Sequence, residues 1–323
     1  MRTSPANPPL FDLLVVGEIN PDLILRDPDI APAFGQAEKL VEEATLTIGS
    51  SSVIMACGAA RLGLRVAFCG LVGDDIFGRF MLESMRERGV DTSACVIDPR
   101  GRPTGLSVIL AYPGGDRAIL THPGNIADMT IDQVDRSLLA RARHLHVSSY
   151  FLLDGLRPDL PDLFLAARQM GLTTSLDTNF DPSCEWQIGK MLDYCDIFLP
   201  NETEALAISG APDLPSALDA LSRRVGTVAI KLGADGAVAR RRGEEVRERP
   251  LPVTVVDAVG AGDSFDAGFI YGALDGRPLT ESLRLGLACG SLSVTAAGGT
   301  AAQPTLEEAL AAIEKHFAAD GDH

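Results

Sequence analysis

The stretch DAVGAGDSFDAGF, residues 257–269, contains a turn of small residues that ends in an acid. Gly260, Ala261 and Gly262 stand directly before Asp263. Hydrophobic residues then recur at helical spacing, which predicts that the turn opens a helix. Residues without a Cβ let another group approach the backbone closely. The pattern therefore predicts a strand-to-helix turn at which a ligand can contact the main chain.

The first turn of such a helix is a candidate anion site. Its backbone N–H groups lack intrahelical partners and carry partial positive charge, so they can hold a phosphate while Asp263 accepts a proton. The alternative is a tight turn with Asp263 as a capping acid. Two other phosphate-binding patterns are excluded. G-x-x-x-x-G-K-[ST] fails because Met191 follows Gly189-Lys190, and G-x-G-x-x-G fails because Phe265 occupies the third glycine position.

Length and charge limit the class of protein. The chain has 323 residues, which suits one large α/β domain with a small appendage. Its net charge of −16 repels nucleic-acid phosphates and anionic membrane surfaces. We therefore expect no nucleic-acid partner and no membrane partner, and an anionic ligand has to be held by local donors.

The cysteine pattern and the apolar runs indicate a cellular location. There is no C-x-x-C pair, no recognisable secretory leader and no run long enough to span a bilayer. We expect a cytoplasmic protein whose thiols are reduced and mostly buried. The six cysteines are Cys57, Cys69, Cys95, Cys184, Cys195 and Cys289.

Short apolar runs alternate with amphipathic segments along most of the chain. This alternation predicts parallel β-α-β units and an α/β fold of three α-β-α layers with a mostly parallel central sheet. The predicted strands lie in residues 11–19, 65–73, 144–149, 173–179, 196–201 and 227–233, and predicted helices include residues 77–89, 161–171 and 202–210.

Two further helix starts have the spacing of a capping box. Thr130 is followed by Gln133, and Thr305 is followed by Glu308. The spacing predicts helices over TIDQVDRSLLARA, residues 130–142, and over TLEEALAAIEKHF, residues 305–317.

Two regions interrupt the alternation of strands and helices. Residues 23–50 lack it, and residues 103–122 indicate a strand, a Pro-Gly-Gly-Asp turn at 113–116 and a second strand. We expect them to pair as a small β-sheet lid. The main α/β domain that binds nucleotide and substrate is then expected to comprise residues 1–22, 51–102 and 123–323.

Several motifs in this order resemble the ribokinase-like (PfkB) carbohydrate kinase family. The usual second signature of that family is Asp-Thr-x-Gly-Ala-Gly-Asp, which DAVGAGDSFDAGF resembles. The other elements are GEINPDL near the first strand, ARLG, GLVGDDIFG, DTNFDP, PNETEA and KLGADGA. Each is weak alone, and their joint order is specific. The resemblance spans nearly the whole chain and implies a ribokinase-like fold.

The resemblance also implies an activity, the ATP-dependent phosphorylation of a hydroxyl on a sugar or sugar-like small molecule. Asp263 would be the general base that accepts the hydroxyl proton, with the backbone of Gly260, Ala261 and Gly262 as the anion hole. A positioned base of this kind contributes about two to four orders of magnitude in rate.

The cofactor side is implied in the same way. Asn201 and Glu204, in PNETEA, would organise Mg²⁺ and the phosphates of ATP, with Glu204 acting on the metal through water. Their alternative reading is a capped helix start. Lys231 and Gly233, in KLGADGA, would border the phosphate or ribose, although Lys231 could instead be an ordinary cation at the end of a strand.

At the sugar end, the resemblance carries over to Asn20 and Asp22 in GEINPDL, which would face substrate hydroxyls. Their alternative is a polar exit from the first strand. The family usually has Gly-Gly followed by a sugar-binding Asn, and here the matching positions are Gly49, Ser50 and Ile54. One sugar hydrogen bond is therefore lost, while Ser50 and its two serine neighbours add hydroxyls, so ribose or fructose specificity does not transfer.

A second departure is Ala258, where the signature usually has Thr. Many relatives bind a monovalent cation beside this turn through main-chain carbonyls, so the resemblance leaves K⁺ open, and a homodimer through the lid is open too. A nucleoside kinase stays an alternative, for which an aromatic clamp from Phe34 or Tyr112 in the lid would be evidence. A non-catalytic nucleotide- or sugar-binding protein of the same fold is the second alternative.

Overall fold

Strand β1 (Leu13–Val16) lies in the interior of the chain's largest sheet, between β10 and β4, and its four residues are all buried. In the computed structural model, which describes residues 10–112 and 117–319, this sheet has nine strands in the order β15-β14-β13-β12-β11-β10-β1-β4-β6. Along this order, neighbouring strands are parallel from β6 through β4, β1, β10, β11 and β12 to β13. Strand β14 is antiparallel to β13, and β15 is antiparallel to β14. The other bounds are β4 (Val66–Cys69), β6 (Val90–Asp91), β10 (His144–Val147), β11 (Thr173–Leu176), β12 (Ile197–Phe198), β13 (Thr227–Lys231), β14 (Ala237–Arg241) and β15 (Glu244–Glu248).

Alternate residues of β1 pack into two different helix layers. Leu14 and Val16 join the hydrophobic core under α3 (Leu160–Gln169), α4 (Glu202–Ser209) and α5 (Leu214–Ser222). Leu13 and Val15 join the core on the opposite face. That core includes residues of α1 (Ser51–Arg61), α2 (Ile76–Glu87), α6 (Ala261–Leu274), α7 (Leu279–Ser293) and α8 (Leu306–Ala319). The predicted three-layer α/β fold is confirmed.

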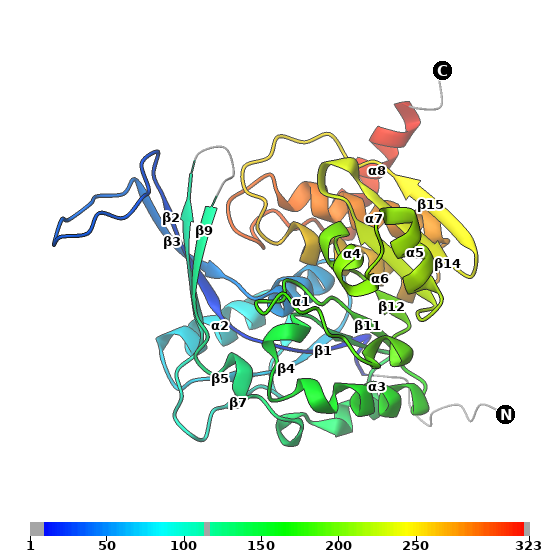
Figure 1. Cartoon of the computed structure of the whole chain (residues 1–323), viewed down its shortest axis with the longest axis horizontal. Helices are drawn as coiled ribbons and strands as arrows, with labels where there is room; N and C mark the ends of the chain where they lie inside the picture. Colours follow the sequence, from blue (N-terminus) through cyan, green and yellow to red (C-terminus); the bar gives the residue numbers. More distant parts are fainter. Residues whose placement is uncertain (1–9, 113–116, 320–323) are drawn as a thin grey trace.

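A second sheet stands beside this body (Figure 1). Its order is β3-β2-β8-β9, with β2 and β8 parallel and the outer pairs antiparallel. The bounds are β2 (Pro21–Arg26), β3 (Glu43–Ile48), β8 (Leu106–Ala111) and β9 (Arg117–His122), and a two-stranded sheet joins β5 (Leu71–Val72) to β7 (Val96–Ile97). The predicted turn at 113–116 lies outside the described residues. The division of the chain into a main domain and a lid stays a prediction.

The α-helix predicted over residues 130–142 is wrong. Two short 3₁₀-helices lie there instead, η2 (Ile131–Gln133) and η3 (Arg136–Arg141). The capping box forms, with Gln133 Oε1 accepting from the Thr130 N–H at 2.8 Å. Asp135 then caps a second start through the Ser137 N–H, and the chain turns at Val134 between the two. The other 3₁₀-helices are η1 (Ile126–Asp128), η4 (Tyr150–Leu152), η5 (Arg157–Asp159), η6 (Met191–Tyr194) and η7 (Gly233–Asp235).

Two expectations, one about membrane-spanning segments and one about the cysteines, can be compared with the described residues. None of the helices in that part of the chain combines the length and apolar character that a bilayer crossing requires. The six cysteines are all free thiols, four of them buried, with Cys184 exposed.

An ionic clamp fixes the start of β1 to both neighbouring strands. The Asp12 carboxylate accepts from the Arg65 N–H and guanidinium at 2.9–3.0 Å, and from Arg143 at 3.2 Å. Arg65 stands at the entry to β4 and Arg143 at the entry to β10. Hydrogen bonds from Arg65 hold the pKa of Asp12 well below its usual value, although burial acts in the opposite direction.

We predict that Asp12→Asn lowers the free energy of unfolding by about 1–3 kcal/mol at pH 7, because charge-assisted bonds are lost. Because the folded-state pKa is depressed, this stabilisation is present above the unfolded pKa of about 3.9 and disappears as pH falls through the folded value. Urea unfolding of both proteins between pH 3 and pH 7 tests this. Asp132→Asn, at an exposed position, is the matched control. A difference that does not shrink at low pH would contradict the assignment.

Candidate active site

Polar residues gather at the carboxyl ends of the parallel strands. Asn20 lies beyond β1, Asp177 directly after β11, Asn201 after β12, and Lys231 ends β13. In open α/β sheets, ligands bind at this edge. A cavity of about 880 Å³ lies here, which we call the polar cavity, and these four residues line it.

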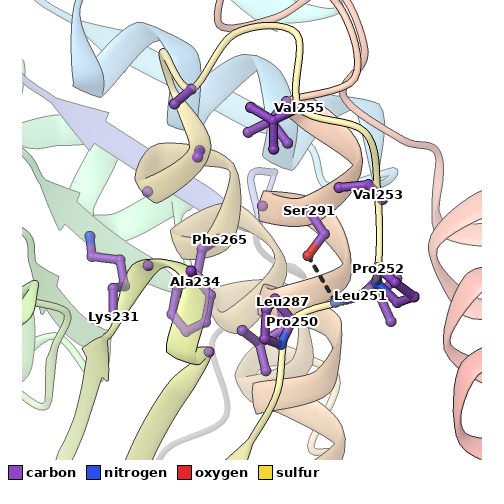
Figure 2. Close-up of a pocket in the computed structure, with 17 residues that line it drawn as sticks. Lys231, Ala234, Pro250, Leu251, Pro252, Val253, Val255, Phe265, Leu287 and Ser291 are labelled. Atoms are coloured by element: carbon purple, nitrogen blue, oxygen red, sulfur yellow. Dashed lines mark hydrogen bonds between the residues drawn. The ribbon is translucent and has the colours of Figure 1, made fainter. Parts of the chain in front are cut away.

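A second cavity adjoins the first. It has a volume of about 430 Å³ and lies between the segment 250–255 and helices α6 and α7 (Figure 2). Its wall is largely apolar, and the Leu251 N–H donates to Ser291 Oγ at 3.1 Å across it. We call it the apolar cavity. The two cavities share five lining residues: Lys231, Gly233, Ala258, Ala261 and Gly262.

The shared wall includes part of the predicted glycine turn, Ala261 and Gly262. Helix α6 begins at Ala261, with Gly260 as its N-cap in the left-handed conformation, φ 73°. A Cβ on Gly260 would lie 2.8 Å from Gly299 Cα, so both the backbone angle and the packing require glycine there. The helix start predicted from residues 260–263 is confirmed, and its first N–H groups lie where the two cavities meet.

Asp263 lies in the first turn of α6 and lines the polar cavity. Its side chain is buried, and burial raises its pKa to about 7, with the negative charges of Asp177 and Glu18 adding to the rise. The positive charge of Lys231 and a hydrogen bond from Ser51 act in the opposite direction. Asp263 is thus a carboxyl group that can gain or lose a proton near neutral pH.

Lys231 is held between two buried carboxyl groups. Its Nζ donates to Asp177 Oδ2 at 2.7 Å and to the two oxygens of Asp266 at 3.2 and 3.3 Å. Burial alone would lower the pKa of Lys231, but Asp177 and Asp266 raise it above its ordinary value. Burial raises the pKa of Asp266 well above its usual range, whereas the Lys231 ammonium overcomes burial to lower that of Asp177. The Lys231 ammonium thus favours the charged form of Asp177, whereas burial favours the neutral form of Asp266.

This cluster links the sheet to the helix that carries Asp263. Asp177 follows β11, Lys231 ends β13, and Asp266 lies one turn after Asp263 on α6. A Cβ on Gly262 would lie 3.5 Å from Lys231 Nζ, so the ammonium packs directly against the glycine turn. The sequence predicted Lys231 beside a phosphate or ribose; it lines both cavities, but its ammonium donates to the carboxyl groups of Asp177 and Asp266. Asp177 and Asp266 were missed.

Asn201 and Glu204 form a full capping box at the start of α4. Glu204 N–H donates to Asn201 Oδ1 at 2.9 Å, while the Asn201 backbone and side-chain N–H groups donate to Glu204 at 2.9 and 2.6 Å. Both residues line the polar cavity, and burial raises the pKa of Glu204 to about 7. The capped helix start therefore exists, and it also faces the cavity. Gly233, with φ 58°, lines both cavities nearby.

The residues predicted at the sugar end also meet at the polar cavity. Asn20, Asp22 and Ser50 line it. Gly49 is absent from the lining; a Cβ there would overlap the Asp22 carboxylate, so the glycine makes room for that side chain. Burial raises the pKa of Asp22 to about 7, and the nearby charge of Arg117 acts against this rise.

The serine run forms contacts that the sequence did not predict. The Ser52 and Ser149 hydroxyls donate to the buried Glu18 carboxylate at 2.5 and 2.9 Å, and the Ser50 hydroxyl donates to the Glu18 main-chain oxygen at 2.7 Å, 3.1 Å from the carboxylate. Ser51 accepts from Asn179 Nδ2 at 3.0 Å. Glu18 follows the first strand directly, and that position was the one signal that could have identified it.

Ile54 and Ala258, the two departures from the family pattern, both line the polar cavity. Ile54 packs against the loop that faces the glycine turn, because Cβ atoms built on Gly260 and Gly299 would lie 3.0 and 2.6 Å from its side chain. An apolar residue thus packs against the turn at the position where the family pattern led us to expect Asn.

Comparisons with known proteins agree with this geometry. The fold is ribokinase-like: a putative ribokinase from Agrobacterium tumefaciens superposes with a TM-score of 0.84 at 23% identity, covering 95% of this chain and 99% of that one. A putative ribokinase II from E. coli, solved in complex with ATP and Mg²⁺, gives 0.82 at 24% identity, covering 95% of this chain and 100% of that one.

The sequence comparisons define the family. Residues 11–306 match the profile described as pfkB family carbohydrate kinase, and the chain belongs to that family. A 5-dehydro-2-deoxygluconokinase of Geobacillus thermodenitrificans is 30% identical over 82% of this chain and 83% of its own length. The predicted family is confirmed, and the chain is a carbohydrate kinase.

We predict that Lys231→Met destabilises the fold by about 3–5 kcal/mol, because removing one partner leaves Asp177 as an uncompensated buried charge. Guanidinium unfolding measures the effect. Lys190→Met, which changes an exposed lysine, is the matched control and is expected to stay within about 0.5 kcal/mol of the original protein. Equal stabilities for the two variants would show that the cluster is not a structural link.

Proposed function

We propose that this carbohydrate kinase transfers the γ-phosphoryl group of ATP to a hydroxyl of a sugar or sugar-like small molecule, with Asp263 as general base. One observation carries the proposal. The N-terminal turn of α6 separates a polar cavity from an apolar cavity, and Asp263 lies on the polar side. An acceptor in the first cavity and a nucleotide in the second would meet at this turn.

Asp263 would take the hydroxyl proton as the oxygen attacks the γ-phosphorus. An alcohol is a weak nucleophile until its proton can leave, and a buried carboxylate at the cavity wall gives it a destination. Charge on the transferring group would be stabilised by the backbone N–H groups of Gly260, Ala261 and Gly262 at the helix terminus. Lys231, which packs behind Gly262, keeps this turn in place.

ATP fits the apolar cavity by size and composition. Its volume of about 430 Å³ lies within the usual range for small-molecule sites, and its wall is lined by Pro250, Leu251, Val253 and Leu287. A base that packs against these side chains would direct its phosphates toward Gly233 and the glycine turn, both on the shared wall.

The oxygen ligands near Asn201 and Glu204 suit Mg²⁺. Both residues line the polar cavity, and each Glu204 oxygen already accepts one bond from Asn201 while retaining a further lone pair. Contact through metal-bound water fits this arrangement, since Mg²⁺ keeps several of its waters. Bound there, Mg²⁺ would neutralise charge on the phosphates. A K⁺ site stays a prediction.

The four-stranded sheet forms one wall of the polar cavity through Asp22, Ser107 and Thr121, which fits a lid over the acceptor. Arg26 on β2 pairs with Asp257 at 2.6 Å, and Asp257 in turn accepts from the Gly298 and Val259 N–H groups at 3.0 Å. This contact ties the lid to the loops beside the glycine turn. A homodimer through the lid stays a prediction.

Phe34 is 97% exposed, and neither it nor Tyr112 lines the polar cavity, so neither lid residue supplies the aromatic clamp that a nucleoside base would need. Phe180 is an aromatic residue of the cavity wall, and its ring packs edge-to-face against Trp186. A nucleoside acceptor therefore stays an alternative to a sugar. The buried, proton-exchanging Asp263 favours catalysis over a binding function without turnover.

We predict that Asp263→Asn lowers kcat by about two to four orders of magnitude while ATP binding is retained, because the amide cannot accept the proton. ADP release measures the rate, and calorimetry with MgATP measures binding. Asp132→Asn, at an exposed position, is the control. An original protein that binds MgATP without turning over any sugar would favour the non-catalytic alternative.

We also predict that kcat/KM falls as the pH drops through about 7, because a protonated Asp263 cannot act as a base. Ser51→Ala removes the hydrogen bond that lowers this pKa, so the midpoint should move to higher pH. The residual rate of Asp263→Asn should no longer change at this pH. That result would distinguish titration of Asp263 from titration of Glu204, whose pKa is also raised to about 7. An unchanged profile in Asp263→Asn would assign the titration to another group.

A further inference from the structure

We infer that the acceptor is a neutral polyhydroxylated molecule without a carboxylate or phosphate group, and that Glu18 is a residue that determines this specificity. The inference rests on the proposed function and names the class of substrate at the same site. It follows from which atoms of the polar cavity can still donate or accept a hydrogen bond.

The Glu18 carboxylate accepts hydrogen bonds from groups in the wall of the polar cavity. One oxygen accepts from the Ser149 hydroxyl at 2.9 Å and from the Ser52 N–H at 3.3 Å; it also lies 3.1 Å from the Ser50 hydroxyl, whose shorter bond, at 2.7 Å, goes to the main-chain oxygen of Glu18. The other accepts from the Ser52 hydroxyl at 2.5 Å. Glu18 is 4% exposed, and four donors from two parts of the chain surround it. This arrangement holds the Glu18 carboxylate in the wall of the polar cavity.

The serines are thereby left as acceptors. A hydroxyl has one hydrogen and two lone pairs, so Ser50 and Ser149, having donated to Glu18, offer only lone pairs to a ligand. Both line the polar cavity.

The amide side chains continue this pattern. Asn179 Nδ2 donates to Ser51 Oγ at 3.0 Å. Asn20 Nδ2 is directed at Pro21 O and Ser107 Oγ, at 3.4 and 3.5 Å. Both asparagines line the cavity, but Asn179 Oδ1 already accepts from the Ser149 N–H at 2.9 Å, so the amide oxygen that this pair offers to a ligand is that of Asn20.

The cationic side chains at this cavity already face carboxylates. Lys231 donates to Asp177 and Asp266. Arg117, on β9, lies near enough to Asp22 for its charge to lower the pKa of that carboxyl. A substrate carboxylate would therefore compete with Asp22 for Arg117 and would stand in the field of Glu18 and Asp263.

Sugar hydroxyls complement such a wall because each can donate a hydrogen bond to an acceptor atom in it. A carboxylate brings none and adds a like charge, which leaves buried acceptors unpaired. Oxidising one carbon of a sugar to a carboxylate should therefore cost more binding energy here than the loss of that carbon's hydrogen bond alone.

Matched pairs test the inference. The pairs are D-ribose with D-ribonate, D-glucose with D-gluconate, and D-mannose with D-mannonate, assayed with saturating MgATP by ADP release within a wider panel of C5 and C6 aldoses, ketoses and polyols. We expect kcat/KM for the neutral member of an active pair to exceed that of the acid by at least about tenfold. Equal or faster turnover of an acid overturns the inference and leaves the kinase function standing. No turnover with any compound overturns both.

Glu18→Gln tests the assigned residue. It removes the charge and adds a donor, so the acid-to-neutral ratio of kcat/KM should rise about tenfold. Glu83→Gln, an exposed position on α2, makes the same change in net charge and should leave the ratio unchanged. Equal ratios in the two folded variants would remove Glu18 from this role.

If Glu18→Gln does not fold, as judged by circular dichroism, Ser149→Ala provides the second test. This variant deletes one acceptor oxygen from the cavity wall and one donor to Glu18. We expect kcat/KM for the neutral sugar to fall about three- to tenfold, with no comparable loss for the acid. An equal loss for both members of a pair would contradict the inference.

Discussion

The ion cluster of Lys231 with Asp177 and Asp266 is the interaction on which the arrangement of the site depends. It is the point at which two strand ends and helix α6 are tied by charge rather than by apolar packing alone. Burying three ionisable groups is costly unless the geometry is good and the charges balance. Here the Lys231 ammonium donates to both carboxyl groups, and it lowers the pKa of Asp177 while burial raises that of Asp266. The helix terminus that holds the phosphoryl group in the proposed mechanism is therefore fixed before any ligand arrives, which is the condition for electrostatic preorganisation.

The sequence allowed most of the fold to be predicted, with one local error. The alternation of apolar runs and helices determines layers and strand direction locally, so the α/β fold could be predicted. The error at residues 130–142 has a local cause. Thr130 and Gln133 do form a capping box, but Asp135 provides a competing helix start five residues later, and the chain satisfies both with two short 3₁₀-helices. A pattern that identifies a helix start carries no information about how far the helix continues.

The predicted site residues fall into two groups. Short motifs could indicate Asp263, Asn201 and Glu204 because each stands within a few residues of the turn or cap that positions it. The partners of Lys231 lie 54 and 35 residues away from it, and those of Glu18 lie 32 to 131 residues away. Such pairings exist only once the strands are in register, and a single sequence does not give that register. The serine run was visible, but the direction of each hydroxyl was not.

The shared wall between the two cavities has an evolutionary consequence. The polar cavity takes its specific surface from the loop after β1, the start of α1 and the four-stranded sheet, whereas the apolar cavity takes its own from the segment 250–255 and α7. Apart from the glycine turn, Ala258, Lys231 and Gly233, the two surfaces draw on different parts of the chain. Under the proposed function, substitutions around Ser50 can therefore alter the choice of sugar without changing the cavity assigned to the nucleotide. A scaffold divided in this way can diversify its substrates while its chemistry stays constant.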